Sequence, residues 1–127
     1  MLYEGKPIGM PGCGAGAFWR LIEQHRVKSF FCAPTALRAI RREDPNGAEM
    51  AKYDLSSLDS VFLAGERCDP NTMQWAQTLL DVHKFKVDIS DNWWQTETGW
   101  PITGSFRGDA MTQKLEATLG SGGYAVW

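Results

Sequence analysis

The sequence predicts an α/β fold, in which helices flank a partial parallel β-sheet. Three short apolar runs of the kind that form buried strands alternate with segments whose apolar residues recur at helical spacing. This alternation favours crossover connections, which place successive strands parallel in one sheet. The chain has 127 residues, of which 43% are hydrophobic, so it has material for one core and not two. We expect one domain or part of one.

The opening of the chain predicts a loop that leads into a helix and then a strand. Residues 1–16 are rich in glycine and proline, which break regular structure. An amphipathic helix follows, because apolar side chains recur at a spacing of three and four residues. Its stripe consists of Phe18, Leu21, Ile22 and His25. Residues 27–33, dominated by Val, Phe and Cys, then predict a buried strand that Pro34 closes.

The next helix has a clear inner and outer face. Leu37 and Ile40 face inward, and residues 44–47, which read DPNG, stop the helix. The outward face carries Arg38, Arg41 and Arg42. These arginines are interpreted as a solvated helix face.

A second strand and a capped helix follow in the middle of the chain. Residues 60–64 predict the strand, and Asp69 is a suitable N-cap with Pro70 at the first helical position. The apolar face of this helix is Met73, Ala76, Leu79 and Leu80.

The third strand is expected over residues 86–90, where Val87 and Ile89 alternate onto one face. The strand runs into residues 91–94, which read DNWW. Beyond Gly99 the pattern is weaker: residues 102–106 are compatible with another strand, and the glycine-rich residues 120–123 with a turn.

Three unusual segments follow the three predicted strands. They are residues 33–35, 65–67 and 91–99. Ligands of parallel sheets bind outside the carboxyl ends of the strands, so these segments are the expected functional site. On position alone, Glu66 and Glu97 are about as suited to ligand binding as to solvation, whereas Trp93 and Trp94 taken alone favour packing.

Composition excludes several classes of partner. The formal net charge is −2, which provides no broad basic surface, so neither nucleic acid nor a membrane is expected as a partner. Cys13, Cys32 and Cys68 are odd in number and lack metal-ligand spacing, which favours a reducing compartment. With no targeting segment in the sequence, we expect a cytoplasmic or mitochondrial matrix location.

The most specific motif is at residues 93–99, which read WWQTETG. It resembles the signature of acetyl- and propionyl-CoA synthetases, the AMP-forming short-chain acyl-CoA synthetases of the adenylate-forming superfamily. The continuation WPI at residues 100–102 leans towards the propionyl branch. Shorter matches in the same order are YEGKP, GAFW, APTALR and AGERCD. The resemblance covers residues 1–107, an AMP-binding subdomain fragment, and leaves residues 108–127 as a poorly matched tail.

The resemblance implies that the chain is part of the large N-terminal domain of such an enzyme, with ATP, Mg²⁺ and CoA as cofactors or substrates. The implied ATP/AMP-binding residues are Gly65, Glu66, Arg67, Asp91, Asn92, Trp93, Trp94, Gln95 and Thr96. It further implies an acyl pocket at Ala64 and Trp94, a CoA tunnel at Ala33 and a metal ligand at Glu97. No catalytic residue is assigned, because the family's lysine-bearing phosphate loop and C-terminal lysine have no counterpart in this sequence.

The implied activity joins a short-chain carboxylate, propionate or acetate, to ATP and then to CoA. The chain alone is expected to be inactive, with the missing subdomains of the same enzyme as its partners. Two alternatives stay open: a stand-alone nucleotide-binding or regulatory module, and an unrelated α/β structural domain.

Overall fold

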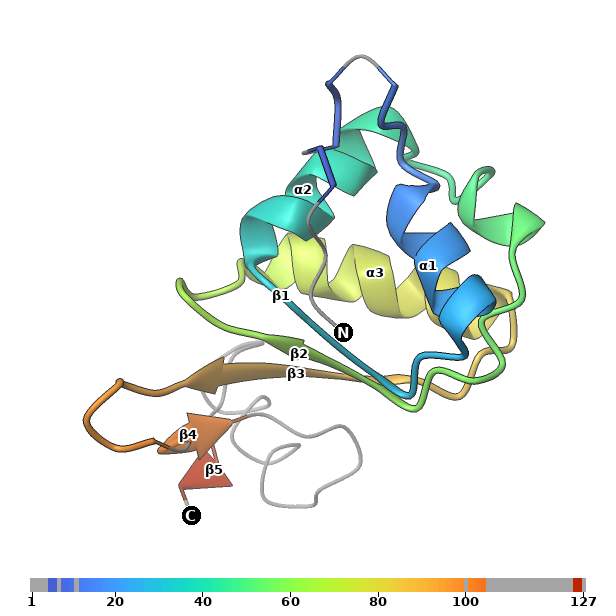
Figure 1. Cartoon of the computed structure of the whole chain (residues 1–127). Helices are drawn as coiled ribbons and strands as arrows, with labels where there is room; N and C mark the ends of the chain where they lie inside the picture. The colour runs from blue at the N-terminus through green and yellow to red at the C-terminus, as the bar shows by residue number, and fades with distance from the viewer. Residues whose placement is uncertain (1–4, 7, 11, 100, 105–124, 127) are drawn as a thin grey trace.

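The computed structural model describes residues 5–6, 8–10, 12–99, 101–104 and 125–126. In chain order the elements are α1 (Ala17–His25), β1 (Ser29–Cys32), α2 (Pro34–Glu43), a 3₁₀ turn (Met50–Lys52), β2 (Ser60–Leu63), α3 (Pro70–Val82), β3 (Asp88–Trp93), β4 (Thr103–Gly104) and β5 (Ala125–Val126). Figure 1 shows the three α-helices on one face of the sheet. In the parts of the chain that the structure describes, no helix has the length and apolar character to cross a membrane.

The sheet confirms the α/β prediction. Its strand order is β1-β2-β3-β4-β5, with β1, β2 and β3 parallel and the two short strands antiparallel. Phe30 lies beside Val61, and Val61 beside Ile89, so one row of apolar side chains crosses the three parallel strands. The carboxyl ends of these strands therefore reach the same edge of the sheet, as the alternating pattern predicted.

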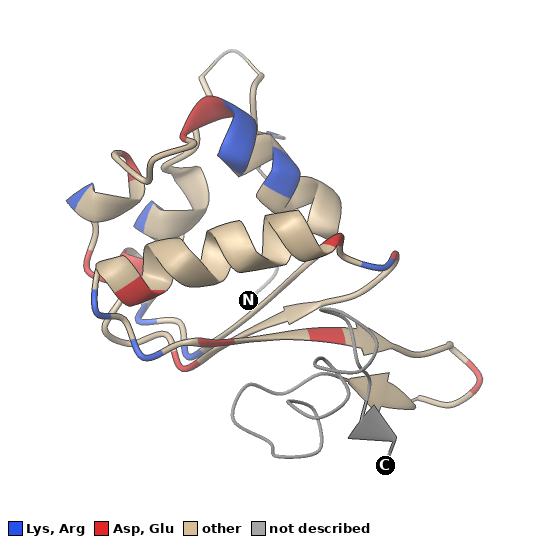
Figure 2. Cartoon of the chain, turned by 180° about the vertical axis from the view of Figure 1, so that it is seen from behind, with Lys and Arg blue, Asp and Glu red and all other residues tan. Residues whose placement is uncertain are grey.

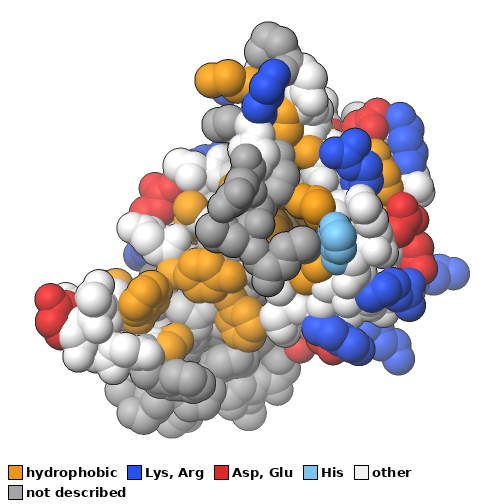
Figure 3. All heavy atoms as spheres, in the orientation of Figure 1, with side chains coloured by type: hydrophobic (Ala, Val, Ile, Leu, Met, Phe, Trp, Pro, Cys, Tyr) orange, Lys and Arg blue, Asp and Glu red, His pale blue; other side chains and the backbone are white. Residues whose placement is uncertain are grey.

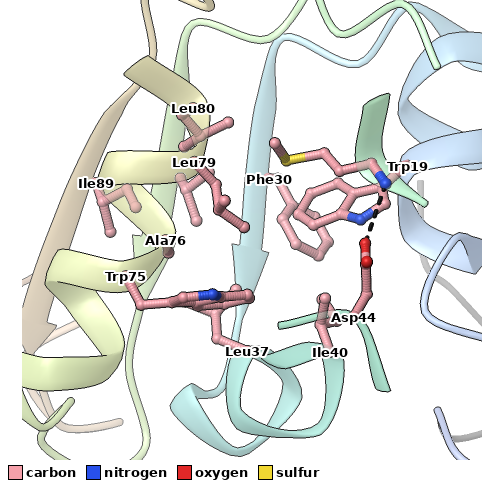
Figure 4. A pocket seen from close by; sticks show the side chains of 12 residues that line it. Trp19, Phe30, Leu37, Ile40, Asp44, Trp75, Ala76, Leu79, Leu80 and Ile89 are labelled. Atoms are coloured by element: carbon pink, nitrogen blue, oxygen red, sulfur yellow. Dashed lines mark hydrogen bonds between the residues drawn. The ribbon is translucent and has the colours of Figure 1, made fainter. Parts of the chain in front are cut away.

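The core fills the space between the helices and this apolar row. Trp19, Ile22, Leu37, Ile40 and Leu63 are all almost completely buried there. Figure 4 shows the residues around a cavity of about 20 Å³ in this layer, to which the helices and the strands both contribute. Because the lining is almost wholly apolar and the space is close to that of one water molecule, this cavity belongs to core packing.

The second and third helices form where the sequence predicted them. Leu37 and Ile40 are the buried face of α2, and Pro34 occupies its first turn. The Asp69 carboxylate accepts a hydrogen bond from the Thr72 backbone N–H at 2.9 Å, which confirms the predicted N-cap of α3.

The first helix and the strand lengths differ from the prediction. His25 is exposed, while Trp19 is buried, so the core-facing side of α1 is rotated from the predicted stripe. The first strand is shorter than predicted: it covers Ser29–Cys32, which pairs residue for residue with Ser60–Leu63 of β2.

The third strand is displaced towards the C-terminus, covering Asp88–Trp93 instead of residues 86–90. Val87 and Ile89 are buried as expected, but the polar Ser90, Asp91 and Asn92 are also buried. The strand was predicted to end near residue 90 and instead continues, because hydrogen bonds hold these polar side chains inside the fold: Asp91 Oδ2 accepts from the Cys68 N–H, and Ser90 and Asn92 bond to each other. Residues 103–104 of the proposed further strand are confirmed, whereas residues 105–106 and 120–123 lie outside the described residues.

Candidate functional site

An open pocket of about 400 Å³ lies at the carboxyl ends of the three parallel strands. It is lined by Phe31, Ala64, Gly65, Trp94, Gln95, Thr96 and Glu97. The lining thus comes from β1, from the segment after β2 and from the segment after β3. In Figure 3 hydrophobic side chains gather on the face of the molecule that carries these strand ends. The pocket therefore lies where the arrangement of the strands predicted a ligand site.

The loop between β2 and α3 enters the pocket through its first residues. Gly65 has a φ of +97°, a left-handed conformation that side-chain-bearing residues rarely adopt. A Cβ built there would meet nothing within 4 Å, so the backbone, and not crowding, requires glycine. At the far end of the loop, the Cys68 N–H donates to the Asp91 carboxylate at 3.2 Å. This bond ties the loop to β3.

Two other predicted residues of this loop, Glu66 and Arg67, are not among the residues that line the pocket. Glu66 accepts a charge-assisted hydrogen bond from Arg38 of α2, so its carboxylate is engaged by a protein group. Arg67 is exposed. Figure 2 shows charged residues in the loop that runs from β2 into α3.

Residues 95–98, in the middle of the WWQTETG motif, form a tight turn. The Thr98 backbone N–H donates to the Gln95 carbonyl at 3.1 Å, and the Thr98 hydroxyl donates to the same oxygen at 2.8 Å. Thr96 and Glu97 are consequently the two central residues of the turn, and both are exposed and line the pocket. Sequence reasoning assigned no role to Thr98, which closes this turn.

The remaining predicted residues do not line the pocket. Asp91 and Asn92 are buried in β3, and Asn92 exchanges hydrogen bonds with Ser90, at 3.2 Å between the side chains and 3.1 Å to the backbone carbonyl. Trp93 is 50% exposed. Ala33 is exposed at the N-cap of α2.

Phe31 is the pocket residue that sequence reasoning missed. Its side chain is 60% exposed and, with Trp94, gives the described lining two aromatic walls. Its position near the carboxyl end of β1 could have indicated this role, because ligands of parallel sheets bind at the carboxyl ends of the strands. Its apolar character instead suggested a place in the core.

Two cysteine thiols near the strand ends are poorly suited to nucleophilic chemistry. Burial, reinforced by the neighbouring Cys68, raises the pKa of Cys32 to about 12. Burial and then Asp91 raise the pKa of Cys68 to about 11. Both thiols are therefore protonated near neutral pH, and a protonated thiol is a poor nucleophile.

The described lining of the pocket contains one carboxylate that could bind a metal ion. Among the described residues, no three His, Cys, Asp or Glu side chains are close enough together to hold a metal ion. Glu97 lines the pocket as a single exposed carboxylate. Magnesium commonly binds through one or two carboxylates together with the phosphates of a substrate, so Glu97 fits this ion only when a nucleotide is also bound.

Comparisons with known proteins agree on one family. A family model described as "AMP-binding enzyme" matches residues 1–127. An uncharacterized protein of Pseudomonas aeruginosa is 55% identical over 103 residues, which is 81% of this chain and 15% of that protein. The human mitochondrial acyl-CoA synthetase short-chain family member 3 is 49% identical over 83% of this chain and 14% of its own length. The propionate–CoA ligase of Escherichia coli is 43% identical over 85% of this chain and 16% of its own length.

A solved structure supports the same fold. The inhibitor-bound N-terminal domain of FACL13 from Mycobacterium tuberculosis superposes with a TM-score of 0.58 at 19% identity, over 82% of this chain and 24% of that one. The chain spans only about one seventh of the curated relatives' length.

Proposed function

The chain belongs to the AMP-binding enzyme family, and we propose that it forms the adenylate-facing wall of a short-chain acyl-CoA synthetase. The observation that carries this proposal is the pocket in which the ends of three parallel strands bring Gly65 and the turn of residues 95–98 together. The unrelated structural domain considered from sequence is wrong, because the family model matches the whole chain.

The proposed reaction has two steps. A carboxylate oxygen of the acid attacks the α-phosphorus of ATP, forming the acyl-adenylate as pyrophosphate leaves. The sulfur of CoA then attacks the acyl carbonyl carbon, and AMP leaves with the electrons of the broken C–O bond. Propionate is the favoured acid and acetate the alternative; the name of the E. coli relative supports propionate.

The nucleotide is proposed to bind along the two segments that follow β2 and β3. Backbone groups around Gly65 face the adenine, since a residue without a side chain leaves the backbone accessible. The Thr96 hydroxyl donates to the α-phosphate, and Glu97 provides the oxygen ligand for Mg²⁺. Both side chains come from the centre of the turn that Thr98 closes, which supports their pointing to one ligand.

The acyl group is proposed to lie between Ala64 and Trp94. The small side chain of Ala64 leaves space next to the indole, and both line the pocket. Ala33 is proposed to border the CoA tunnel, and its exposed position at the start of α2 is compatible with this role. A cytoplasmic or mitochondrial matrix location is proposed for the complete enzyme.

The runner-up function is nucleotide binding without catalysis. It is favoured by the same open pocket, whose described lining includes no residue assigned to catalysis. Both functions predict an adenylate ligand, but only the first predicts turnover once the rest of an enzyme is supplied.

A chimera tests this choice. We would replace the aligned segment of the E. coli propionate–CoA ligase by this chain's matching residues, since the two are 43% identical over 108 residues. ATP-dependent formation of propionyl-CoA is expected, with the intact ligase as a positive control. The isolated chain is titrated in parallel with a non-hydrolysable propionyl-adenylate analogue and, as a control, its guanosine counterpart. A folded chimera without turnover, paired with tight adenosine-selective binding, would support the runner-up instead.

A further inference from the structure

We propose that Arg38 is a positioning residue that holds the loop between β2 and α3 so that Gly65 faces the nucleotide. The inference deepens the proposed function and rests on it. Sequence reasoning interpreted Arg38 as part of a solvated helix face, together with Arg41 and Arg42. The structure gives Arg38 a different environment from an ordinary surface arginine.

The guanidinium of Arg38 bridges two carboxylates of the loop. Its Nη2 donates to Glu66 Oε1 at 2.5 Å, and its Nη1 lies 3.4 Å from Asp69 Oδ2. The Arg38 side chain is 37% exposed, so most of it is covered. A planar guanidinium holds two acceptors in a fixed relative geometry, which a lysine ammonium does not. Arg38 therefore connects α2 to both ends of the charged part of the loop.

On the pocket side, the Ala64 N–H donates to the Cys32 carbonyl at 3.3 Å and holds the residue before Gly65, and the Arg38 bridge holds the residue after it. The Cys68 N–H bond to Asp91 and the Asp69 cap of α3 hold the loop's far end. Glu66 directly follows Gly65, which lines the pocket. Because Gly65 has wide backbone freedom, an anchor on the next residue is needed to keep it in one conformation.

The bridge also controls charge beside the pocket. Glu97 already places one carboxylate in the lining. If Glu66 lost its guanidinium partner, a second uncompensated carboxylate would lie next to a site proposed for a polyanionic nucleotide. Repulsion between like charges would weaken nucleotide binding. The two effects act in the same direction, since loss of Arg38 loosens the loop and makes its surroundings more negative.

The first test uses the propionate–CoA ligase chimera that carries this chain. With Arg38→Met we expect KM for ATP to rise about fivefold while kcat changes little, because partly exposed charge pairs make modest contributions. Arg38→Lys should restore part of the loss, through charge without the planar fork. Arg42→Met is the matched control: it lies on the same helix, and its guanidinium Nε lies 3.5 Å from the adjacent Glu43 instead of contacting the loop. It should leave KM for ATP unchanged.

A second readout is independent of catalysis. Trypsin cleaves after arginine, and Arg67 is exposed in this loop, so cleavage of the Arg67–Cys68 bond in the isolated chain reports loop opening. We expect Arg38→Met to speed this cleavage about fivefold, and Glu66→Gln to have a similar effect. The combined Arg38→Met and Glu66→Gln variant should be no faster than Arg38→Met alone, because Arg38→Met already removes the contact with Glu66. Arg42→Met should cleave at the original rate.

The two readouts separate the possible failures. A chimera that is inactive with the original residues rejects the proposed function, and the trypsin rates then still decide whether Arg38 holds the loop. Unchanged trypsin cleavage in Arg38→Met overturns the inference, and so does faster cleavage with an unchanged KM for ATP. If Arg38→Met does not fold, Arg38→Lys and Glu66→Gln carry the same test.

Discussion

At the scale of single residues, Trp94 has the most testable role. If its indole closes the acyl pocket beside Ala64, then Trp94→Gly in the chimera leaves a space that longer alkyl chains fill. Each methylene buried in that space contributes about 0.8 kcal/mol, so several added carbons should shift the preference in kcat/KM by tenfold or more. The measurement is kcat/KM for a series of acids from acetate to octanoate. An unchanged chain-length profile would return Trp94 to a packing role.

Thr96 and Glu97 provide the contrasting prediction. They are proposed to contact phosphate and Mg²⁺, which are common to all substrates, so Thr96→Ala and Glu97→Ala should lower kcat/KM by a similar factor for every acid. Loss of one charge-assisted hydrogen bond corresponds to a factor on the order of tenfold or more. Raising the Mg²⁺ concentration should partly rescue Glu97→Ala and leave Thr96→Ala unaffected. A loss confined to one chain length would contradict this assignment.

At the scale of secondary-structure elements, the N-cap of α3 gives a prediction on stability. Hydrogen bonds from Thr72, with a smaller effect of Arg38, hold the pKa of Asp69 below its ordinary value of 3.8. A depressed folded-state pKa means that the stabilisation is fully present above that ordinary value and is lost as the pH falls through the folded-state pKa. Asp69→Ala should therefore lower the free energy of unfolding by about 1 kcal/mol at pH 7, and by less near pH 3.

Urea unfolding at both pH values measures this difference. Asp69→Asn is the matched control, because asparagine also caps a helix but carries no charge. Asp69→Asn should retain most of the free energy of unfolding at pH 7, and this free energy should change less with pH than that of the original protein. A deficit of Asp69→Ala that stays the same at pH 3 would rule out the carboxylate as its source.

At the scale of the whole molecule, the isolated chain is predicted to make no acyl-CoA. Both reaction steps require positive groups placed around the phosphates, and the family's phosphate-loop lysine and C-terminal lysine have no counterpart in this sequence. The purified 127-residue protein is incubated with ATP, Mg²⁺, propionate and CoA, and thioester is measured by mass spectrometry. The intact E. coli ligase is the positive control. Robust thioester formation by the chain would refute the prediction.

The exposed aromatic side chains of the isolated chain predict that it self-associates. Phe31, Trp93 and Trp94 are 60%, 50% and 41% exposed, and among the described strands β1 lies at the edge of the sheet. Exposed aromatic side chains beside an open sheet edge favour association. Sedimentation velocity should therefore show oligomers, and Phe31→Ser should shift the distribution towards monomer. A dispersed monomer that binds no hydrophobic dye would count against this prediction.

The sequence by itself determined the elements whose signals are local. Three features were predictable: the Asp69–Pro70 start of α3, the Leu37 and Ile40 face of α2, and the parallel arrangement of β1, β2 and β3. Capping, helical spacing and strand–helix alternation each depend on neighbouring residues. The expectation that ligands bind at the carboxyl ends of parallel strands also predicted where the pocket lies, and the motif at residues 93–99 indicated the family.

Only the tertiary structure decided which of these residues share the pocket. Asp91 and Asn92 are buried in β3, and Glu66 is paired with Arg38, 28 residues before it in the chain. Phe31 joins the lining although its sequence context resembles a core strand. The reason is physical: the direction of a side chain and the partner of a charge depend on contacts between elements far apart in the sequence, and no local pattern records those contacts.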